Sequence, residues 1–328
     1  MKDFCIVGSG IAGSSIANLL SKKYSVEIFD KARGPGGRAS NRRYKDNLSF
    51  DHGLQYLSPK SNKFKKFILD LKRKNVLKEW SGNHFDLNFK KTKSIKYVGT
   101  KGNNDICKYL IKNIKSNFLS EVTNIKFSSN YWTITINNKD KFFFKNLILT
   151  CPFPQLKKLS SKYLGKKILK FNPHMIANIT VMAAYKNYKQ IPISTIRFNN
   201  TDIAWAGQEN TKNRFKSNQV LWTIQCTEKF SKQTINLFKQ NKKKYEQLIL
   251  KKFQDLTGYE TKNITYKNIH GWKYAYRNLE TSELEPSWSN KFQFGVCGDW
   301  LFGSKAEHAW MSANNLYFRI KKNLPKKI

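Results

Sequence analysis

The fold of this chain is decided near its N-terminus by the run Phe4-Cys5-Ile6-Val7-Gly8-Ser9-Gly10-Ile11-Ala12-Gly13. Its four apolar residues predict a buried strand, and the glycines that follow have the spacing G-x-G-x-x-G. Apolar residues at helical spacing continue to Leu20, and a second strand pattern at residues 25–29 is followed by Asp30. Strand, glycine-rich turn, helix, strand and terminal acidic residue together form the βαβ unit that binds dinucleotides.

Each glycine of this turn has its own role. Gly8 permits the tight turn, Gly10 lets the backbone approach a pyrophosphate, and Gly13 lets the helix pack on the strand. The helix N-terminus then presents free N–H groups and the positive end of its dipole to the phosphates. Asp30, about 20 residues further on, is placed to accept a hydrogen bond from a ribose hydroxyl.

The residues after Asp30 indicate which dinucleotide is bound. The run Lys31-Ala32-Arg33-Gly34-Pro35-Gly36-Gly37-Arg38 resembles the second signature of the flavin amine-oxidase superfamily. In that family the arginine approaches the FAD phosphates, and the glycines let the loop pass close to the flavin. The resemblance therefore implies that FAD is the cofactor.

Two further stretches resemble the bacterial-type renalase branch of this superfamily. One is Phe50-Asp51-His52-Gly53-Leu54-Gln55-Tyr56, and the other is Gly295-Val296-Cys297-Gly298-Asp299-Trp300 with residues 307–312 after it. In the family the aspartate of the second stretch binds the ribityl–phosphate region, and the next helix points its N-terminus at the flavin carbonyl. Four motifs in order along the whole chain make the protein similar to renalase-like, FAD-dependent oxidoreductases.

The resemblance implies non-covalent FAD binding by residues from four parts of the chain. In related FAD enzymes the valine of the strand predicted at residues 121–127 meets the adenine. The expected cofactor contacts are Gly8, Gly10, Ile11, Ala12, Gly13, Asp30, Lys31, Gly37, Arg38, Gln55, Tyr56, Val122, Gly298 and Asp299.

The composition is that of a globular chain in a reducing compartment. Hydrophobic residues make up 40% of the 328 positions, yet no apolar run approaches the ~20 residues that span a bilayer. The N-terminus enters a strand directly, without a leader pattern, so we expect a cytoplasmic protein. The five cysteines are isolated in sequence, which favours reduced thiols and gives no metal-ligand spacing. For Cys297 the pattern favours a buried thiol over a tether to the flavin.

A formal charge of +38 raises the question of nucleic-acid binding. Only nine of the 60 basic residues are arginine, and the lysines are scattered without a continuous stripe. We therefore expect no specific nucleic-acid site, only salt-sensitive, non-specific attraction to polyanions.

The other patterns predict two interleaved domains, since no linker or repeat divides the chain. The fold class is α/β plus α+β, with a Rossmann-like FAD-binding domain of the GR2 type and an antiparallel-sheet substrate domain. Residues 1–59, 97–160 and 286–328 are assigned to the FAD-binding domain, and residues 60–96 and 161–285 to the substrate domain. Helices are expected at residues 61–77, 104–117 and 239–256, a hairpin at 131–144 and a separate buried strand at 147–152. The helix at 239–256 is expected to bury Tyr245, Leu248, Ile249, Phe253 and Leu256.

Substrate contacts are expected around the run Ile269-His270-Gly271-Trp272-Lys273-Tyr274-Ala275. This run resembles the family's HRWRYA motif, with Gly271 in place of its first arginine. His270, Trp272 and Tyr274 would line the substrate side of the flavin, because an aromatic side chain can stack on a flat substrate. Gln55 and Tyr56 would face them from the FAD side.

The resemblance implies oxidation of 2- and 6-dihydro isomers of NAD(P) to NAD(P)+, with O2 reduced to hydrogen peroxide. A flavin carries such chemistry, so no acid/base triad or metal is needed. Two alternatives remain open at this point. One is a flavin amine oxidase or a related desaturase, with an amine as substrate of the former. The other is a non-catalytic basic flavoprotein that binds RNA or an acidic partner. The patterns do not indicate an oligomeric state.

Overall fold

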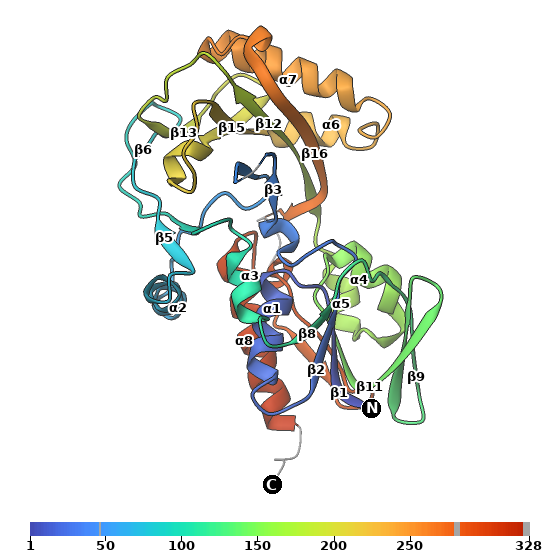
Figure 1. Cartoon of the computed structure of the whole chain (residues 1–328). Helices are drawn as coiled ribbons and strands as arrows, with labels where there is room; N and C mark the ends of the chain where they lie inside the picture. The colour runs from blue at the N-terminus through green and yellow to red at the C-terminus, as the bar shows by residue number, and fades with distance from the viewer. Residues whose placement is uncertain (46, 279–282, 324–328) are drawn as a thin grey trace.

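The computed structural model describes residues 1–45, 47–278 and 283–323, and it has two lobes (Figure 1). The first lobe is built on an eight-stranded sheet and the second on a six-stranded sheet. Short pairs, β3 (Asn41–Arg43) with β4 (Ser49–Asp51) and β5 (Leu77–Glu79) with β7 (Tyr97–Gly99), complete the strands. In the described residues no helix has both the length and the apolarity to cross a membrane.

The first sheet contains the predicted βαβ unit. Strand β1 pairs in parallel with β2 on one side and with β11 on the other, and α1 (Ile11–Leu20) connects β1 to β2. The strands in pairing order are β17 (Ser287–Ser289), β18 (Phe294–Val296), β11 (Asp140–Leu149), β1 (Lys2–Val7), β2 (Val26–Phe29) and β8 (Lys115–Asn117). A hairpin of β9 (Val122–Ser128) and β10 (Tyr131–Ile136) extends from β11.

Helices cover this sheet on one face, where they share a buried core with Phe4, Ile6 and Ile28. They are α1, α2 (Asn62–Arg73), α3 (Asp105–Leu110) and α8 (Ala306–Asn323). A second core, which includes Trp132 and Trp300, joins the sheet to the β9–β10 hairpin and to α4 (Phe153–Ser160) and α5 (Lys166–Phe171). Burial on both faces explains why β1 and the end of β11 are continuous apolar runs.

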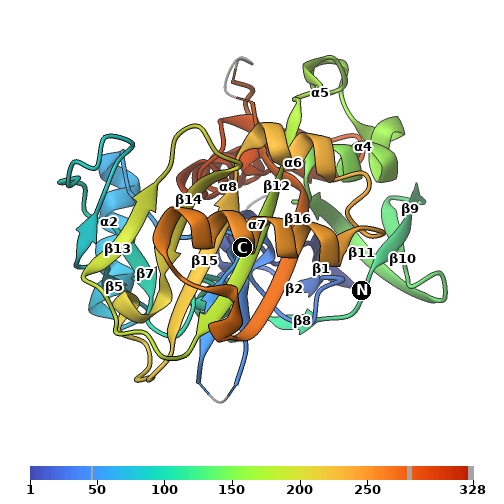
Figure 2. The same cartoon turned by 90° about the horizontal axis from the view of Figure 1, so that it is seen from above.

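The second sheet lies above the carboxyl ends of the first-sheet strands in Figure 1. Adjacent strands within this sheet are antiparallel, except for the β13–β6 pair, which is parallel. The order is β16 (Ile264–Arg277), β12 (Met175–Tyr185), β15 (Val220–Cys226), β14 (Ile203–Gln208), β13 (Ile193–Arg197) and β6 (Asn83–His84). Helices α6 (Glu228–Thr234) and α7 (Lys242–Thr257) lie across its outer face (Figure 2). The other face is turned toward the first lobe.

The prediction of a helix at residues 104–117 is wrong for the second half of that segment. Helix α3 ends at Leu110, and residues 115–117 form β8, which pairs in parallel with β2. The free edge of β2 takes up this segment, because Lys115 is ion-paired to Glu27 at 2.8 Å and the Asn117 amide bonds to the same carboxylate. Long-range strand pairing thus overrides a local helical pattern.

Two other expected elements also differ. The second arm of the 131–144 hairpin and the buried strand at 147–152 are one continuous strand, β11, because its N-terminal half pairs with β10 and its C-terminal half with β1. In α7 the apolar face is narrower than expected. Ile249 and Phe253 are buried, but Leu248 and Leu256 are 39% and 44% exposed.

The packing also differs from the expected domain boundaries at two helices. Helix α2, expected in the substrate domain, contributes Phe64, Ile68 and Leu71 to the core of the first lobe. Helix α5 lies beyond the boundary expected at residue 160, yet Ile168 packs in the second core of the same lobe. Between these helices, β6 joins the second sheet, so the chain passes from the first lobe to the second and back again between α2 and α3.

Candidate active site between the two lobes

A cavity of ≈ 1290 Å³ lies between the two sheets, and both lobes contribute to its lining. Sites for drug-sized ligands have volumes of about 300–1,000 Å³, so this one has room for a large ligand or for two ligands together. The first lobe contributes the glycine turn to the cavity lining, and the second lobe contributes residues of β14, β15 and β16.

The glycine turn has the geometry that its sequence predicts. Gly8 has φ +101°, which disfavours any residue with a side chain. A Cβ atom on Gly13 would lie 1.9 Å from the Gly8 carbonyl oxygen, so only glycine lets α1 start this close to β1. Gly10 lines the cavity, and no side chain caps the N-terminus of α1. The first-turn N–H groups are therefore available to an anion in the cavity.

Asp30 lies at the cavity wall and is held by three hydrogen bonds from the protein. One carboxylate oxygen accepts from the Ser9 backbone N–H at 2.7 Å and from the Ser9 hydroxyl at 2.6 Å. The other accepts from the Ala32 N–H at 2.8 Å. Asp30 thus also braces the glycine turn against the loop after β2, a function that the motif does not predict.

Arg38 and Asp299 come from opposite ends of the chain and form one bidentate ion pair at the cavity wall. The two guanidinium N–H groups donate to the carboxylate oxygens at 2.8 and 2.5 Å. Arg38 also donates to the Ala275 carbonyl at 2.7 Å, which connects the pair to β16. The sequence suggested separate contacts of the arginine with phosphate and of the aspartate with the ribityl chain. The structure shows that the two side chains also pair with each other.

The cavity gathers most of the residues expected to contact the cofactor. Gly13 is the exception, since it lies beneath the turn in contact with Gly8. The expected residues in the lining are Gly8, Gly10, Ile11, Ala12, Asp30, Lys31, Gly37, Arg38, Gln55, Tyr56, Val122, Gly298 and Asp299. The start of α8 reaches the same wall through Ala306 and Ala309.

At the other end of the cavity, His52, His270 and Trp272 form an aromatic cluster. The Trp272 ring lies 4.3 Å from the His270 ring and 5.2 Å from the His52 ring, centroid to centroid. The Trp272 indole N–H donates to the His52 carbonyl at 2.8 Å, and Gln225 of β15 donates to the Gly53 carbonyl at 3.0 Å. The second sheet therefore holds the 52–53 segment in place. Tyr274 lines the cavity from the same strand.

Both histidines of this cluster are neutral at physiological pH. Burial lowers the pKa of His52 to about 3, with His270 and Arg42 nearby adding to the effect. Burial, Arg42 and Lys242 lower the pKa of His270 to about 4. Neither imidazole supplies a positive charge, so the aromatic cluster can contact a ring system but cannot neutralise a phosphate.

Two residues of the cavity wall have a buried polar atom that lacks a partner. The Nδ1 atom of His52 and the Oε1 atom of Gln55 are buried without a hydrogen bond in the protein. Both residues line the cavity. Buried polar atoms of this kind normally have partners, but neither atom is exposed to the cavity, so a ligand would bond to them only if the side chains moved.

Gly271 departs from the family motif but does not weaken the cavity wall. A Cβ atom on Gly271 would lie 3.0–3.1 Å from Phe238 and Ile235, in the region after α6 on the outer face of the sheet. Because side chains alternate along a strand, a side chain at this position begins on the face opposite to His270 and Trp272. An arginine there would begin on the outer face.

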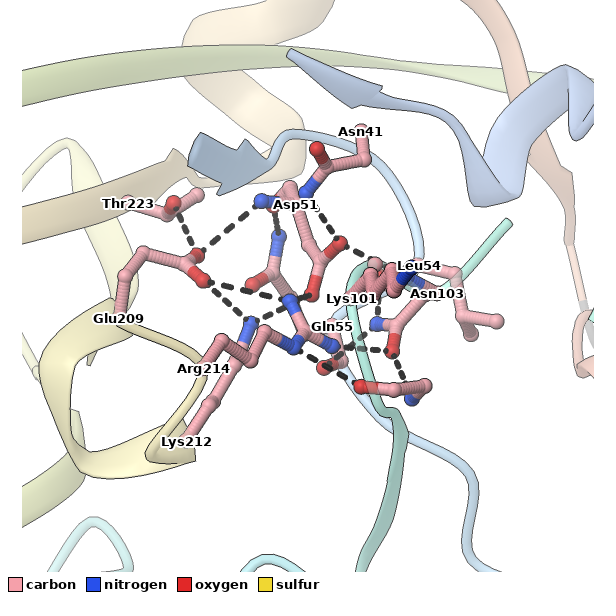
Figure 3. Close-up of polar contacts among 12 residues, drawn as sticks. Asn41, Asp51, Leu54, Gln55, Lys101, Asn103, Glu209, Lys212, Arg214 and Thr223 are labelled. Atoms are coloured by element: carbon pink, nitrogen blue, oxygen red, sulfur yellow. Dashed lines mark hydrogen bonds and ion pairs between the residues drawn. The ribbon is translucent and has the colours of Figure 1, made fainter. Parts of the chain in front are cut away.

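A buried ionic cluster, which sequence reasoning missed, supports the segment between the lobes (Figure 3). Asp51 accepts from the Lys212 ammonium at 2.8 Å and from the Arg214 guanidinium at 2.5 Å. Lys212 also lies 2.9 Å from Glu209, whose other oxygen accepts from the Asp51 N–H and from the Thr223 hydroxyl. These four charged side chains are at most 2% exposed.

The cluster extends to the cavity wall through an asparagine. Arg214 donates to the Asn103 side-chain oxygen at 3.0 Å, and the Asn103 amide donates to the carbonyls of Leu54 and Gln55. Although burial acts to raise the pKa of Asp51, Arg214 and Lys212 outweigh it and hold that pKa well below its ordinary value. Only Asp51 lies in a recognisable motif. The others are isolated charged residues in a lysine-rich chain, and nothing in their spacing indicates burial.

Within the part of the chain that the structure describes, no group of three or more His, Cys, Asp or Glu side chains could hold a metal ion. The five cysteines are free, and Cys297 is fully buried in the core of the first lobe.

Comparison with known proteins supports this reading of the fold. Residues 6–71 match the family described as an NAD(P)-binding Rossmann-like domain. The whole structure is similar to that of a candidate protoporphyrinogen oxidase from Exiguobacterium sp. 255-15, with a TM-score of 0.74 and 10% identity over 98% of this chain and 99% of the other. Wild-type putrescine oxidase bound to putrescine is similar over the same shares, with a TM-score of 0.69 and 10% identity.

This chain has the flavin-oxidase fold. An oxidoreductase from Methanosarcina mazei is also similar, with a TM-score of 0.62 and 14% identity over 96% of this chain and 99% of that one. Identities this low show a shared fold alone, and the substrate must be argued from the cavity itself.

Proposed function

We propose that this protein is an FAD-dependent oxidoreductase that oxidises dihydronicotinamide dinucleotides, with O2 reduced to hydrogen peroxide. The observation that carries the proposal is the continuity of the cavity. One space runs from the glycine turn to His270, Trp272 and Tyr274. FAD held by the turn would therefore extend toward the aromatic cluster, where the substrate would bind.

In this proposal the first lobe holds FAD without a covalent bond. Gly10 and the N-terminus of α1 would bind the pyrophosphate, and Asp30 the adenosine ribose. The Arg38–Asp299 pair and the start of α8 lie further along the same wall, where the flavin half would fit. Cys297 is buried in the core outside the cavity lining, which supports a cofactor that acid or heat releases.

The charge of the second lobe favours an anionic substrate over a diamine. Its contribution to the lining includes two cations, Arg197 and Lys273, and one carboxylate, Glu228. A dinucleotide carries a pyrophosphate that such cations attract, whereas a diamine is itself a cation that they would repel. The flat Trp272 ring and the neutral His270 suit a nicotinamide ring.

FAD, when bound, supplies a two-electron acceptor for the substrate hydride and returns to its oxidised form by passing the electrons to O2. The protein's part is to orient the substrate and keep water away. Hydride transfer needs the donor carbon about 3–3.5 Å from its acceptor, and a misplacement of about 1 Å costs on the order of a hundredfold in rate. A cavity that places C2 or C6 of the nicotinamide correctly thus discriminates against C4 without any acid/base residue.

A flavin amine oxidase is the second candidate within the same chemistry. The similarity to putrescine oxidase favours it, because that protein has a similar fold and was seen with putrescine bound. Rapid flavin reduction by benzylamine or putrescine, with the dihydronicotinamide isomers inert, would favour it over our proposal.

A non-catalytic flavoprotein that binds RNA or an acidic partner is the candidate from another class, and the charge of +38 is the feature that favours it. Such a protein would hold a flavin that no candidate substrate reduces. The five free thiols are compatible with a cytoplasmic site for any of the three.

Anaerobic absorbance spectra test the proposal. The yellow protein should bleach rapidly with 2- or 6-dihydro-NAD(P) and slowly with 4-dihydro-NADH, and air should restore the colour with peroxide as product. Trp272→Ala should slow the bleaching while the protein keeps its flavin. Trp272→Phe, which keeps a ring but loses the hydrogen bond to His52, is the matched control and should retain most of the rate. Equal bleaching by all three dihydronicotinamides would contradict positional selection.

A further inference from the structure

The hairpin formed by residues 84–92 carries an exposed apolar tip. The chain turns at Asp86, whose carboxylate accepts from the N–H groups of Asn88 and Lys90 at 2.9 Å each. Residues 87–89 form the tip, where Leu87 is 44% and Phe89 64% exposed. Ile95, shortly after the hairpin, is 58% exposed. Three of the eleven exposed large hydrophobic residues in the described chain thus fall within nine positions.

Phe89 adopts a backbone conformation that a phenylalanine disfavours. Its φ is +54°, in the left-handed region, at the end of a three-residue hairpin loop where glycine or asparagine is usual. A bulky residue in this region is uncommon and costs on the order of 1 kcal/mol or more. Since the ring is mostly exposed, packing does not compensate for this cost. The disfavoured backbone and the exposed ring together suggest that the Phe89 ring contacts another molecule or surface.

Three lysines follow the apolar tip in the sequence. Lys90, Lys91 and Lys93 are exposed, and none forms an ion pair with a carboxylate of the described residues. Exposed apolar side chains next to unpaired cations have the chemistry of an element that binds at the surface of an anionic bilayer. The apolar groups enter the acyl boundary there, and the lysines meet lipid phosphates.

The hairpin also has a fixed relation to the cavity. The Phe85 N–H donates to the Thr195 carbonyl of β13, and the Asn199 side chain donates to the Leu87 carbonyl at 3.2 Å. Arg197 lies between these two contacts, is exposed, and lines the cavity. A surface that binds the hairpin would therefore lie beside an end of the cavity that reaches the solvent.

We propose that residues 84–95 form a docking element for anionic lipid surfaces, with Leu87 and Phe89 inserted and Lys90, Lys91 and Lys93 on the headgroups. The element docks peripherally and does not span the bilayer. It acts independently of the substrate that the cavity accepts.

Sedimentation with large unilamellar vesicles tests this proposal. The full-length flavoprotein is mixed with vesicles of phosphatidylcholine alone or with a third of phosphatidylglycerol, at near-physiological salt. Binding is expected only to the anionic vesicles. Phe89→Gly should weaken it about tenfold or more, because an inserted aromatic ring is lost. The same change removes the backbone strain, so the midpoint of thermal unfolding should hold or rise. A purely structural role for Phe89 would predict the opposite.

Leu119→Gly is the matched control, since Leu119 is 62% exposed and has φ +55° in the first lobe. It should bind the vesicles as tightly as the unchanged protein. Replacement of Lys90, Lys91 and Lys93 by glutamine should weaken binding by about fivefold per lysine. The same number of changes at Lys126, Lys139 and Lys141, near the β9–β10 hairpin on the opposite side in Figure 1, should have a much smaller effect.

Equal loss of binding in both lysine variants, with Phe89→Gly unaffected, would overturn the proposal, because general charge attraction would then explain all binding. Binding of an acidic peptide that depends on Phe89, without any binding to vesicles, would also overturn it and would make the partner a protein.

Discussion

At the glycine-turn end of the cavity, most of the wall comes from one βαβ unit near the N-terminus. At the aromatic end it comes from segments up to 220 residues apart in sequence, such as His52 and Trp272. The first end relies on the absence of side chains at Gly8, Gly10 and Gly13. The second relies on contacts between side chains and distant segments. The buried cluster of Asp51, Glu209, Lys212 and Arg214 supports it through Asn103, which bonds to Leu54 and Gln55. Local backbone geometry therefore builds one site and long-range electrostatics the other, and each should respond to a different kind of mutation.

The largest effect is expected from a methyl group at the dinucleotide end. Gly13→Ala places a Cβ atom 1.9 Å from the Gly8 carbonyl oxygen, which is backbone and cannot swing aside. The free energy of unfolding should fall by more than about 4 kcal/mol, above the usual cost of overpacking, and flavin should be lost. Urea unfolding and the flavin absorbance of the purified protein measure both. Gly34→Ala, with open space around its Cβ position, is the control and should change neither.

Removal of one charge from the buried cluster should have the next largest effect. Asp51→Ala leaves Lys212 and Arg214 with only Glu209 as a counter-charge, and breaking a buried ion pair in this way costs about 3–5 kcal/mol. Urea unfolding should show this loss of stability. Substrate affinity should also fall, because the cluster supports residues 51–55. Asp255→Ala removes one partner of an exposed pair with Lys251 and should cost less than about 1 kcal/mol. Similar losses in the two variants would remove the distinction drawn here.

The aromatic end should also make stability depend on pH. His270 has an ordinary pKa of 6.5 when unfolded and about 4 when folded, so below pH 6.5 the unfolded chain binds the proton and the folded one does not. The free energy of unfolding should therefore decrease as the pH falls from 6.5 toward 4, by on the order of 2–3 kcal/mol for this group. His270→Phe should reduce that dependence, as measured by urea unfolding at pH 7.5 and 4.5. An unchanged pH dependence would mean that His270 titrates normally.

The smallest effect is expected at Asp30 and Asp299, where cofactor affinity should change more than the fold. Loss of a charged hydrogen-bond acceptor at either position should cost about 1.5–3 kcal/mol of FAD binding, or roughly ten- to a hundredfold. Asp30→Ala also loses the bonds from Ser9 and Ala32. Titration of the apoprotein with FAD measures the affinity. Full flavin occupancy of both variants at limiting FAD would show that neither carboxylate serves the cofactor.

The amino-acid sequence was sufficient to predict the dinucleotide end, because the constraint there is local. A positive φ at Gly8, a close helix–strand contact at Gly13 and an acid at the end of the second strand are all consequences of residues within about 20 positions of each other. The same holds for the motif residues around Gln55 and Asp299, whose approach to the cavity follows from their resemblance to a known pattern.

The ionic cluster, the β8 strand and the pairing of Arg38 with Asp299 needed the folded chain. Lys212 reads as one more surface lysine in a chain of +38 charge, yet it is fully buried, since η3 (Glu209–Lys212) packs against β4 between the lobes. Residues 115–117 follow a helical pattern until the edge of β2 becomes available to them. Burial and pairing of this kind depend on contacts between segments that are distant in the sequence. The local spacing of residues does not predict those contacts.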